Sequence, residues 1–90
     1  MSKSATPRAD DAAQIVPLHA YAESRRNLFP SSGSIDWFVR RHKQRLAKEG
    51  ALLLVRGARA GWHVHTARFD EVHLEIMREE TQRYIASQAA

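Results

Sequence analysis

The sequence predicts one α+β domain, mostly helical, in the order α-α-β-β-α. Three observations support this fold class. Apolar residues recur at three- and four-residue spacing in separate stretches, which is typical of helices with one buried side. Glycines bracket a short apolar run and a second alternating run, which favours a β-hairpin. The 90-residue chain, 43% hydrophobic and 27% charged, is long enough for a single small core. We expect a disordered tail over residues 1–13 and the domain over residues 14–90.

A short first helix is expected over residues 17–26, after a piece from Gln14 to Val16 that could be extended. Pro17 suits the first turn of a helix, where its missing N–H is not needed. The residues that would bury one side of this helix are Leu18, Tyr21 and Ala22. Pro30 then prevents the helix from continuing.

The central helix is predicted from Ile35 to about Glu49, and its two faces differ sharply. Ser34 is expected to cap its start with Asp36 in the first turn, and Gly50 is expected to end it. At 100° per residue, the apolar face contains Ile35, Phe38, Val39, His42 and Leu46. The opposite face contains Trp37, Arg40, Arg41, Gln44 and Lys48. One face can therefore pack on a core while the other presents cations, hydrogen-bonding groups and an aromatic ring.

A hairpin follows, with a strand over residues 51–55, a turn over 57–61 and a returning strand over 62–65. We expect Trp62 on the returning strand to lie in the core, and Thr66 to cap the next helix.

The last helix is predicted over residues 67–87. Its core stripe is formed by Phe69, Val72 and Ile76. Four apolar residues do not fit that stripe well: Leu74, Met77, Tyr84 and Ile85. They indicate a second contact, such as another copy of the protein, although a helix wrapped around its own domain explains them equally well.

Charge is distributed unevenly along the chain. The net charge is +4 with a sequence pI of about 10.1, which favours acidic partners. Residues 25–68 carry ten Lys/Arg against two acids, a net of +8, whereas residues 69–90 carry −3. A basic middle and an acidic end are typical of a nucleic-acid binder with a separate interaction surface.

Several function classes have little support in the sequence. The chain has no cysteine, which excludes disulfides and thiol catalysis. No apolar run approaches the length of a membrane span, so we expect a cytoplasmic protein. There is no Gly-rich phosphate loop, nucleophile elbow or HExxH motif, so we expect neither an enzyme nor a cofactor.

The chain has five histidines, a residue type that often binds metal ions. His63 and His65 share one face of a strand, and His73 or Glu75 could complete a site with them. Their spacing matches no zinc pattern, and paired surface histidines commonly just sit on a polar sheet face. We therefore expect no metal.

The order short helix, turn, basic helix, hairpin and helix is that of a winged helix-turn-helix. The segment LFPSSGSIDWFVRRHKQRLAKEGALLLVRGARAGWHVHTARFDEV resembles the DNA-binding core of excisionases, also called recombination directionality factors. These small proteins of phages and integrative elements are related in fold to the MerR-type DNA-binding domain. The resemblance covers roughly residues 18–73. It rests on the pattern S-x-x-S-I-x-W-F, then a hairpin with Arg, then F-x-x-x, and not on an invariant motif.

The resemblance implies a function without an active site. Several copies would bind repeats near an attachment site on double-stranded DNA, bend it, and let a tyrosine or serine recombinase (integrase) run towards excision. The copies would associate along the DNA, with the acidic last helix of one meeting the basic block of the next. The protein would be nucleoid-associated when bound to DNA.

The DNA contacts implied by the resemblance lie at the central helix and on the hairpin. Serines at the helix start would touch phosphates, the exposed helix face would lie in the major groove, and hairpin arginines would lie near the minor groove. The residues are Ser31, Ser32, Ser34, Trp37, Arg40, Arg41, Gln44, Lys48, Arg56 and Arg59. Asp36 departs from the MerR-type pattern, which often has Arg there. It would serve the helix terminus or accept a hydrogen bond from a cytosine amino group.

Two other functions stay open. The protein could be a small transcriptional regulator of a mobile element, which differs from an excisionase in where its binding sites lie. It could also be a protein-interaction module of antitoxin or adaptor type that uses Trp37 and the last helix. Strong salt dependence of DNA binding would argue against that second alternative.

Overall fold

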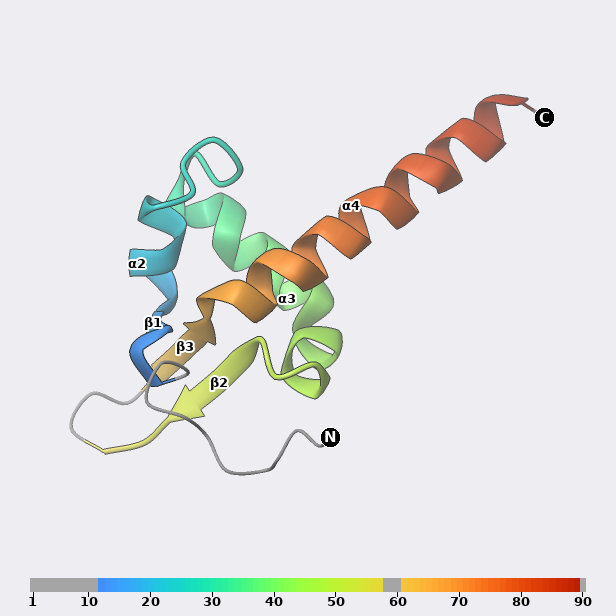
Figure 1. Ribbon diagram of the computed structural model, residues 1–90. Coiled ribbons are helices and arrows are strands. Elements are labelled where there is room, and N and C mark those ends of the chain that lie inside the picture. The colour runs from blue at the N-terminus through green and yellow to red at the C-terminus, as the bar shows by residue number, and fades with distance from the viewer. Residues whose placement is uncertain (1–11, 58–60, 90) are drawn as a thin grey trace.

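The computed structural model describes residues 12–57 and 61–89 (Figure 1). Within them the chain forms a three-stranded sheet and three helices. The elements are β1 (Ile15–Pro17), α2 (Leu18–Glu23), α3 (Ser32–Lys48), β2 (Leu52–Val55), β3 (Gly61–His65) and α4 (Thr66–Ala89). The coarse class is therefore α+β and mostly helical, as predicted. The predicted tail lies outside the described residues, apart from Ala12 and Ala13, which are exposed.

The sheet has one strand more than the order α-α-β-β-α allows, so that predicted order was incomplete. β1 pairs antiparallel with β3, which also pairs with β2, giving the strand order β1-β3-β2. Val16 and Leu52 both lie opposite Val64. Gln14 holds the end of β1 against α4, because its backbone oxygen accepts the Thr66 N–H at 2.9 Å. The N-terminal segment is thus an integral edge of the sheet.

α2 is shorter than the predicted helix over residues 17–26. Pro17 lies just before the first helical residue, not within the first turn. Beyond Glu23 the chain makes turns that backbone hydrogen bonds close, with the N–H groups of Leu28 and Phe29 both donating to the Arg25 oxygen. Phe29 is buried at 5% exposure, so this loop contributes to the core.

α3 begins three residues earlier than predicted, and Ser34 is not its cap. The cap is Ser31, whose hydroxyl accepts the Ser34 N–H at 3.2 Å, while the Ser34 hydroxyl accepts the Ser31 N–H at 3.3 Å. Such a reciprocal capping box satisfies two of the N–H groups that a helix start leaves without partners. The predicted stop at Gly50 is confirmed, because it adopts a φ of 77°, which suits glycine.

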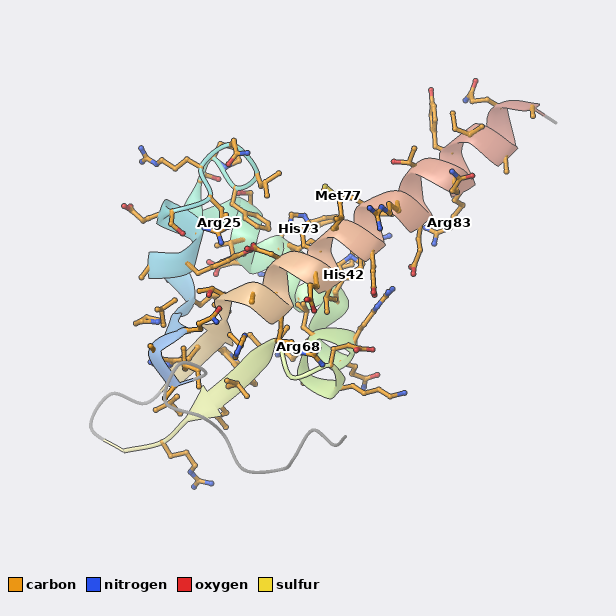
Figure 2. The ribbon with its side chains drawn as sticks, viewed as in Figure 1. Arg25, His42, Arg68, His73, Met77 and Arg83 are labelled. Carbon is orange, nitrogen blue, oxygen red and sulfur yellow. The ribbon has the colours of Figure 1, made fainter. Side chains whose placement is uncertain are left out.

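α3 is kinked at His42, which has φ −118° and ψ 22°. No proline or glycine lies there, so the sequence carried no sign of a break. His42 lies where α3 and α4 cross, and its ring contacts Phe38 at 4.7 Å between centroids (Figure 2). The exposed face of α3 therefore changes direction near its middle.

The core lies between α2, α3, the inner face of the sheet and the first half of α4. The predicted apolar face of α3 is confirmed, since four of its five residues are buried: Ile35, Phe38, Val39 and Leu46. The predicted stripe of α4 is buried too, and Trp62 is partly buried against the core. His73 of α4 was not predicted to be buried, yet it is 7% exposed and its ring stacks on Phe29 with 4.9 Å between centroids.

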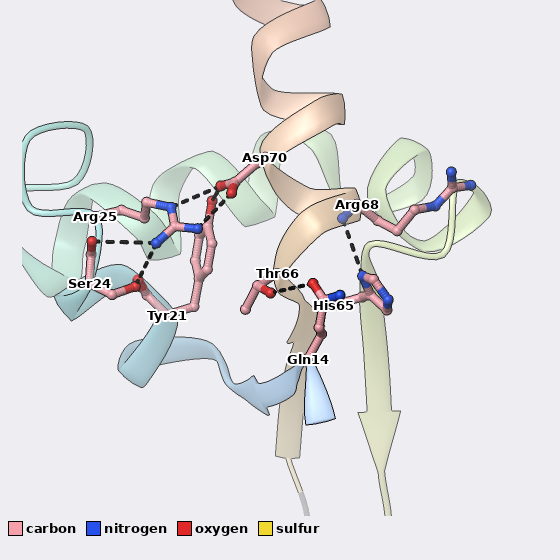
Figure 3. Close-up of polar contacts among 8 residues, drawn as sticks. All are labelled: Gln14, Tyr21, Ser24, Arg25, His65, Thr66, Arg68 and Asp70. Carbon is pink, nitrogen blue, oxygen red and sulfur yellow. Dashed lines mark hydrogen bonds and ion pairs between the residues drawn. The ribbon is translucent and has the colours of Figure 1, made fainter. Parts of the chain in front are cut away.

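The start of α4 also differs from the prediction. Thr66 is the first residue of the helix, and its hydroxyl donates to Gln14 Oε1 at 3.0 Å and does not cap the helix. His65 has that role, because its Nδ1 accepts the Arg68 N–H at 3.2 Å (Figure 3). At its other end, α4 continues beyond the domain body (Figure 1).

Candidate nucleic-acid interface

The exposed face of α3 is the candidate site. Its predicted residues are all exposed: Trp37, Arg40, Arg41, Gln44 and Lys48. This follows from the helical spacing, because the buried residues of α3 occupy the opposite side. The kink at His42 divides the face into two segments, with Trp37, Arg40 and Arg41 before it and Gln44 and Lys48 after it.

Two aromatic rings support cations on or beside this face. The Arg41 guanidinium carbon lies 5.3 Å from the centroid of the Trp37 ring, one helical turn earlier. Lys43 Nζ lies 5.5 Å from the centroid of Trp62 on β3. A cation over a ring face is attracted by the ring electrons while its N–H groups stay available for a partner. Trp37 is 56% exposed, so it supports Arg41 from outside the core.

The start of α3 provides hydrogen-bond donors next to this face. The hydroxyls of Ser31 and Ser34 are used in the capping box, and Ser34 Oγ also donates to the Ser31 backbone oxygen at 2.6 Å. The Ser32 hydroxyl forms no hydrogen bond with any described residue. Helix starts favour anions because their first N–H groups lack partners inside the helix.

The hairpin contributes Arg56, which is exposed directly after β2. Arg59, the other predicted hairpin contact, lies in residues 58–60, outside the described part of the chain. Lys43 and Trp62 were not among the predicted contacts, although they link α3 to β3. Helical spacing could have indicated Lys43 as a contact, because it lies three residues after Arg40 and so on a neighbouring part of the helix surface.

Asp36 has a different environment from the predicted one. It lies beyond the first turn of α3, so it does not serve the helix terminus. Its Oδ1 is 2.9 Å from Nε2 of His19 on α2, and both side chains are about half exposed. A shallow groove begins at this pair, and its other walls are Pro17, Leu18, Gly61, Trp62 and His63. Within the described residues, no three His, Asp or Glu side chains are close enough to hold a metal ion.

The acidic residues of α4 are engaged inside the chain. Four of the five form ion pairs with arginines: Asp70 with Arg25, Glu71 with Arg68, and Glu75 and Glu79 with Arg45. Glu80 lies 3.8 Å from His42 Nε2. The predicted head-to-tail contact therefore has few free carboxylates to offer a neighbouring copy.

Arg45 is held most firmly of the α3 cations. Its Nη1 donates to Glu79 Oε1 at 2.7 Å and its Nη2 to Glu75 Oε1 at 3.2 Å. The hydrogen bond from Arg45 lowers the pKa of Glu79, and the same bond raises the pKa of Arg45. By contrast, Arg40, Lys48 and Arg56 form no ion pair with any described residue. Pairing with α4 thus removes Arg45 from the candidate interface and leaves uncompensated cations on the other side of α3.

His42 adds no charge to the face at neutral pH. Burial lowers its pKa from the usual 6.5, although Glu80 opposes that shift. The His42 Nε2 atom lies 3.8 Å from Glu80 Oε2, which is too far for a hydrogen bond.

A clamp centred on Asp70 fixes α2 against α4 (Figure 3). Asp70 accepts two hydrogen bonds from Arg25, at 2.9 and 2.6 Å, and one from the Tyr21 hydroxyl at 2.6 Å. Burial raises the pKa of the Tyr21 hydroxyl, and the Asp70 carboxylate raises it further. This clamp orients the helix that precedes α3, and so it orients the start of the candidate interface.

Two further findings concern the chain as a whole. No helix among the described residues is long and apolar enough to cross a membrane. No family model, curated protein or solved structure matches this chain.

Proposed function

We propose that this protein is a sequence-specific DNA-binding factor of the excisionase type, with a winged helix-turn-helix in which α3 enters the major groove. The observation that carries the proposal is the separation of charge around α3. Arg45, on the side towards α4, is neutralised by Glu75 and Glu79, whereas Arg40 and Lys48 on the outer face have no acidic partner in the described chain. An uncompensated cationic helix face attracts phosphates and releases their counterions.

Each residue of the outer face has a chemistry that suits DNA. Arg40 and Arg41 present the planar donors that read guanine edges, and Gln44 can pair with an adenine edge. Lys48 and the Ser32 hydroxyl suit phosphates, which position a protein without reading sequence. Arg56 on the hairpin suits the minor groove, whose negative potential attracts arginine.

The role in recombination rests on the resemblance of residues 18–73 to excisionases. In this proposal several copies bind neighbouring sites, bend the DNA, and direct an integrase towards excision. Bending costs a few kcal/mol, on the order of 1–6 for a short site, and the added contacts of several copies offset that cost.

The test uses a DNA fragment that spans the attachment site of the host element, with a scrambled fragment of equal length as control. We expect binding that prefers the attachment fragment and arrives in several steps, and excision in a reaction with the cognate integrase. Preference for a promoter fragment, with no effect on excision, would instead assign the regulator function. Equal weak binding to both fragments would reject specific DNA recognition.

A further inference from the structure

The last part of α4 forms an arm that touches the domain at its base, through the pairs of Glu79 with Arg45 and Glu80 with His42, and then extends away from it. Residues 78–89 are all exposed, and Figures 1 and 2 show this segment extending beyond α2, α3 and the sheet. Two large apolar residues of the arm, Tyr84 and Ile85, are 62% and 55% exposed. Because the arm continues a helix that the domain has already formed, it can propagate without a new nucleus. Its exposed apolar side chains remain available to a partner surface.

The arm also has a seam suited to a helical partner. Its residues alternate three- and four-residue steps: Leu74, Met77, Thr81, Tyr84 and Gln88. Ile85 lies beside them. This heptad spacing keeps one stripe facing a second helix in a two-stranded coiled coil. The seam lies roughly 100° around the helix from the stripe that packs on the core. It is thus a second, independent contact face.

The fold restricts how a partner can run along the seam. Asp70 lies on the same side of α4 as the seam, and there it binds Tyr21 of α2 and Arg25 in the turn after α2. α2 therefore occupies the seam side at the start of α4. A parallel second copy would bring its own α2 into the same space, whereas an antiparallel copy would place its domain beyond the tip of the arm.

The positions of the charged residues along the arm are compatible with antiparallel pairing of two arms. With Thr81 opposite Tyr84 of the second copy, Met77 lies opposite Gln88 of that copy. Arg78 then lies beside Ile85 of the second copy, where its aliphatic stem can cover the apolar side chain. Glu80 lies beside Ser87 of the second copy, so no like charges oppose each other.

We propose that the arms of two copies pair antiparallel through this seam to form a two-fold symmetric dimer. The interface is small, because each arm contributes only a few side chains to it, whereas stable interfaces bury about 1,200–2,000 Å². The dimer is therefore weak when free, and it strengthens when both copies are held on one scaffold, because tethering raises their effective concentration. The pairing does not rest on the proposed function, since it needs no DNA.

The first test is sedimentation equilibrium of the full chain without DNA, across a concentration range from about 5 to 500 μM. Wild type should pass from one copy to two. Tyr84→Glu should weaken the dimer by on the order of tenfold or more, because it puts a charge in the seam itself, opposite Thr81 of the second copy. Gln82→Glu is the matched control, because it adds the same charge to the side of the arm away from the seam. Single copies of wild type at all concentrations, or equal effects of the two variants, would overturn the proposal.

The second test fixes the direction. Because the chain has no cysteine, any disulfide between two copies must join the introduced cysteines and so identifies which positions lie close together. A mixture of Met77→Cys and Gln88→Cys copies should form a mixed disulfide on oxidation, whereas Gln88→Cys alone should not cross-link. Efficient self-cross-linking of Gln88→Cys would show parallel arms and overturn the antiparallel arrangement.

Discussion

Replacing Asp70 with asparagine tests how firmly α4 holds α2. The carboxylate binds Arg25 in two-pronged geometry, and such charge-assisted pairs are among the stronger hydrogen bonds in proteins. The side chains of Arg25 and Asp70 are 29% and 42% exposed, so solvent weakens the pair. Asparagine keeps the shape and one acceptor for Tyr21. We therefore expect Asp70→Asn to lower the free energy of unfolding by about 1–2 kcal/mol at pH 7.

The dependence on pH gives this prediction a second readout. Burial raises the pKa of Asp70, but the hydrogen bonds from Arg25 and Tyr21 outweigh that effect and lower it below 3.8. A carboxyl whose pKa is lowered by folding stabilises the fold above its unfolded value, and this contribution is lost as the pH falls through the folded value. The difference between wild type and Asp70→Asn should therefore shrink below about pH 4.

The assay is urea unfolding followed by tryptophan fluorescence, at pH 7 and at about pH 2.5. A domain of this size loses roughly 1 kcal/mol of stability per molar urea, so the midpoint should fall by about 1–2 M at pH 7. Glu71→Gln removes the same charge one residue later, where the carboxylate is 64% exposed, and should shift the midpoint far less. Equal shifts for the two variants, or an Asp70→Asn effect that persists undiminished at low pH, would refute the reasoning.

Three further predictions concern the fold. Burial lowers the pKa of His73 from 6.5, so the stability that its neutral form contributes is fully present above that pH and is lost as the pH falls. His73→Phe should therefore flatten the decrease in the free energy of unfolding between pH 7 and 5. An unchanged slope would contradict this prediction. Ser31→Ala removes the helix cap and should lower the free energy of unfolding, measured by thermal unfolding, by about 1 kcal/mol. Ser32→Ala is the control and should lower it by less than about 0.5 kcal/mol. A larger loss for Ser32→Ala than for Ser31→Ala would exclude the capping box. Gly50→Ala should cost on the order of 1 kcal/mol in the same assay, because φ there is +77° while no atom crowds the new Cβ; unchanged stability would contradict it.

The sequence predicted the elements whose pattern is local and long. The two faces of α3 followed from helical spacing over more than four turns, and Gly50 marked the end of the helix. β1 could not be predicted with equal force, because three residues that include Pro17 show no alternation. Its existence depends on pairing with β3, nearly fifty residues later.

Competing local signals explain the errors at helix ends. Ser31, Ser32 and Ser34 are all good caps by residue type, and only the reciprocal bonds of Ser31 and Ser34 decide between them. His73 looks like a surface residue by composition. It is buried because Phe29 and Phe38, from other elements, bring their rings within 4.9 and 4.6 Å of its ring centre.

The sequence predicts which residues of α3 are exposed, but it does not predict which of its cations are paired with acidic residues. Helical spacing places Arg40, Arg41 and Lys48 outward whatever the rest of the chain does. The pairing of Arg45 with Glu75 and Glu79 joins residues thirty or more positions apart, so no local pattern reveals it. That pairing places acidic residues against Arg45 on one side of α3 and leaves a cationic face on the other.

The salt dependence of DNA binding tests that cationic face most directly. The affinity of each variant for attachment-site DNA would be measured by fluorescence anisotropy from 50 to 300 mM salt. Five cations on or beside the face can meet phosphates or bases: Arg40, Arg41, Lys43, Lys48 and Arg56. At about 0.9 per phosphate contact, the slope of log K against log salt is about −4 to −5 when all five meet phosphates, and about −3 when Arg40 and Arg41 meet base edges only.

Arg40→Ala and Arg41→Ala should each weaken binding and reduce that slope by up to about 0.9. The matched control is Arg83→Ala, which removes an exposed arginine from α4 outside the seam and should leave both affinity and slope nearly unchanged. This result would locate the DNA on the outer face of α3. Equal losses for all three variants, or no loss for Arg40→Ala and Arg41→Ala, would contradict the assignment of α3 as the DNA-binding helix.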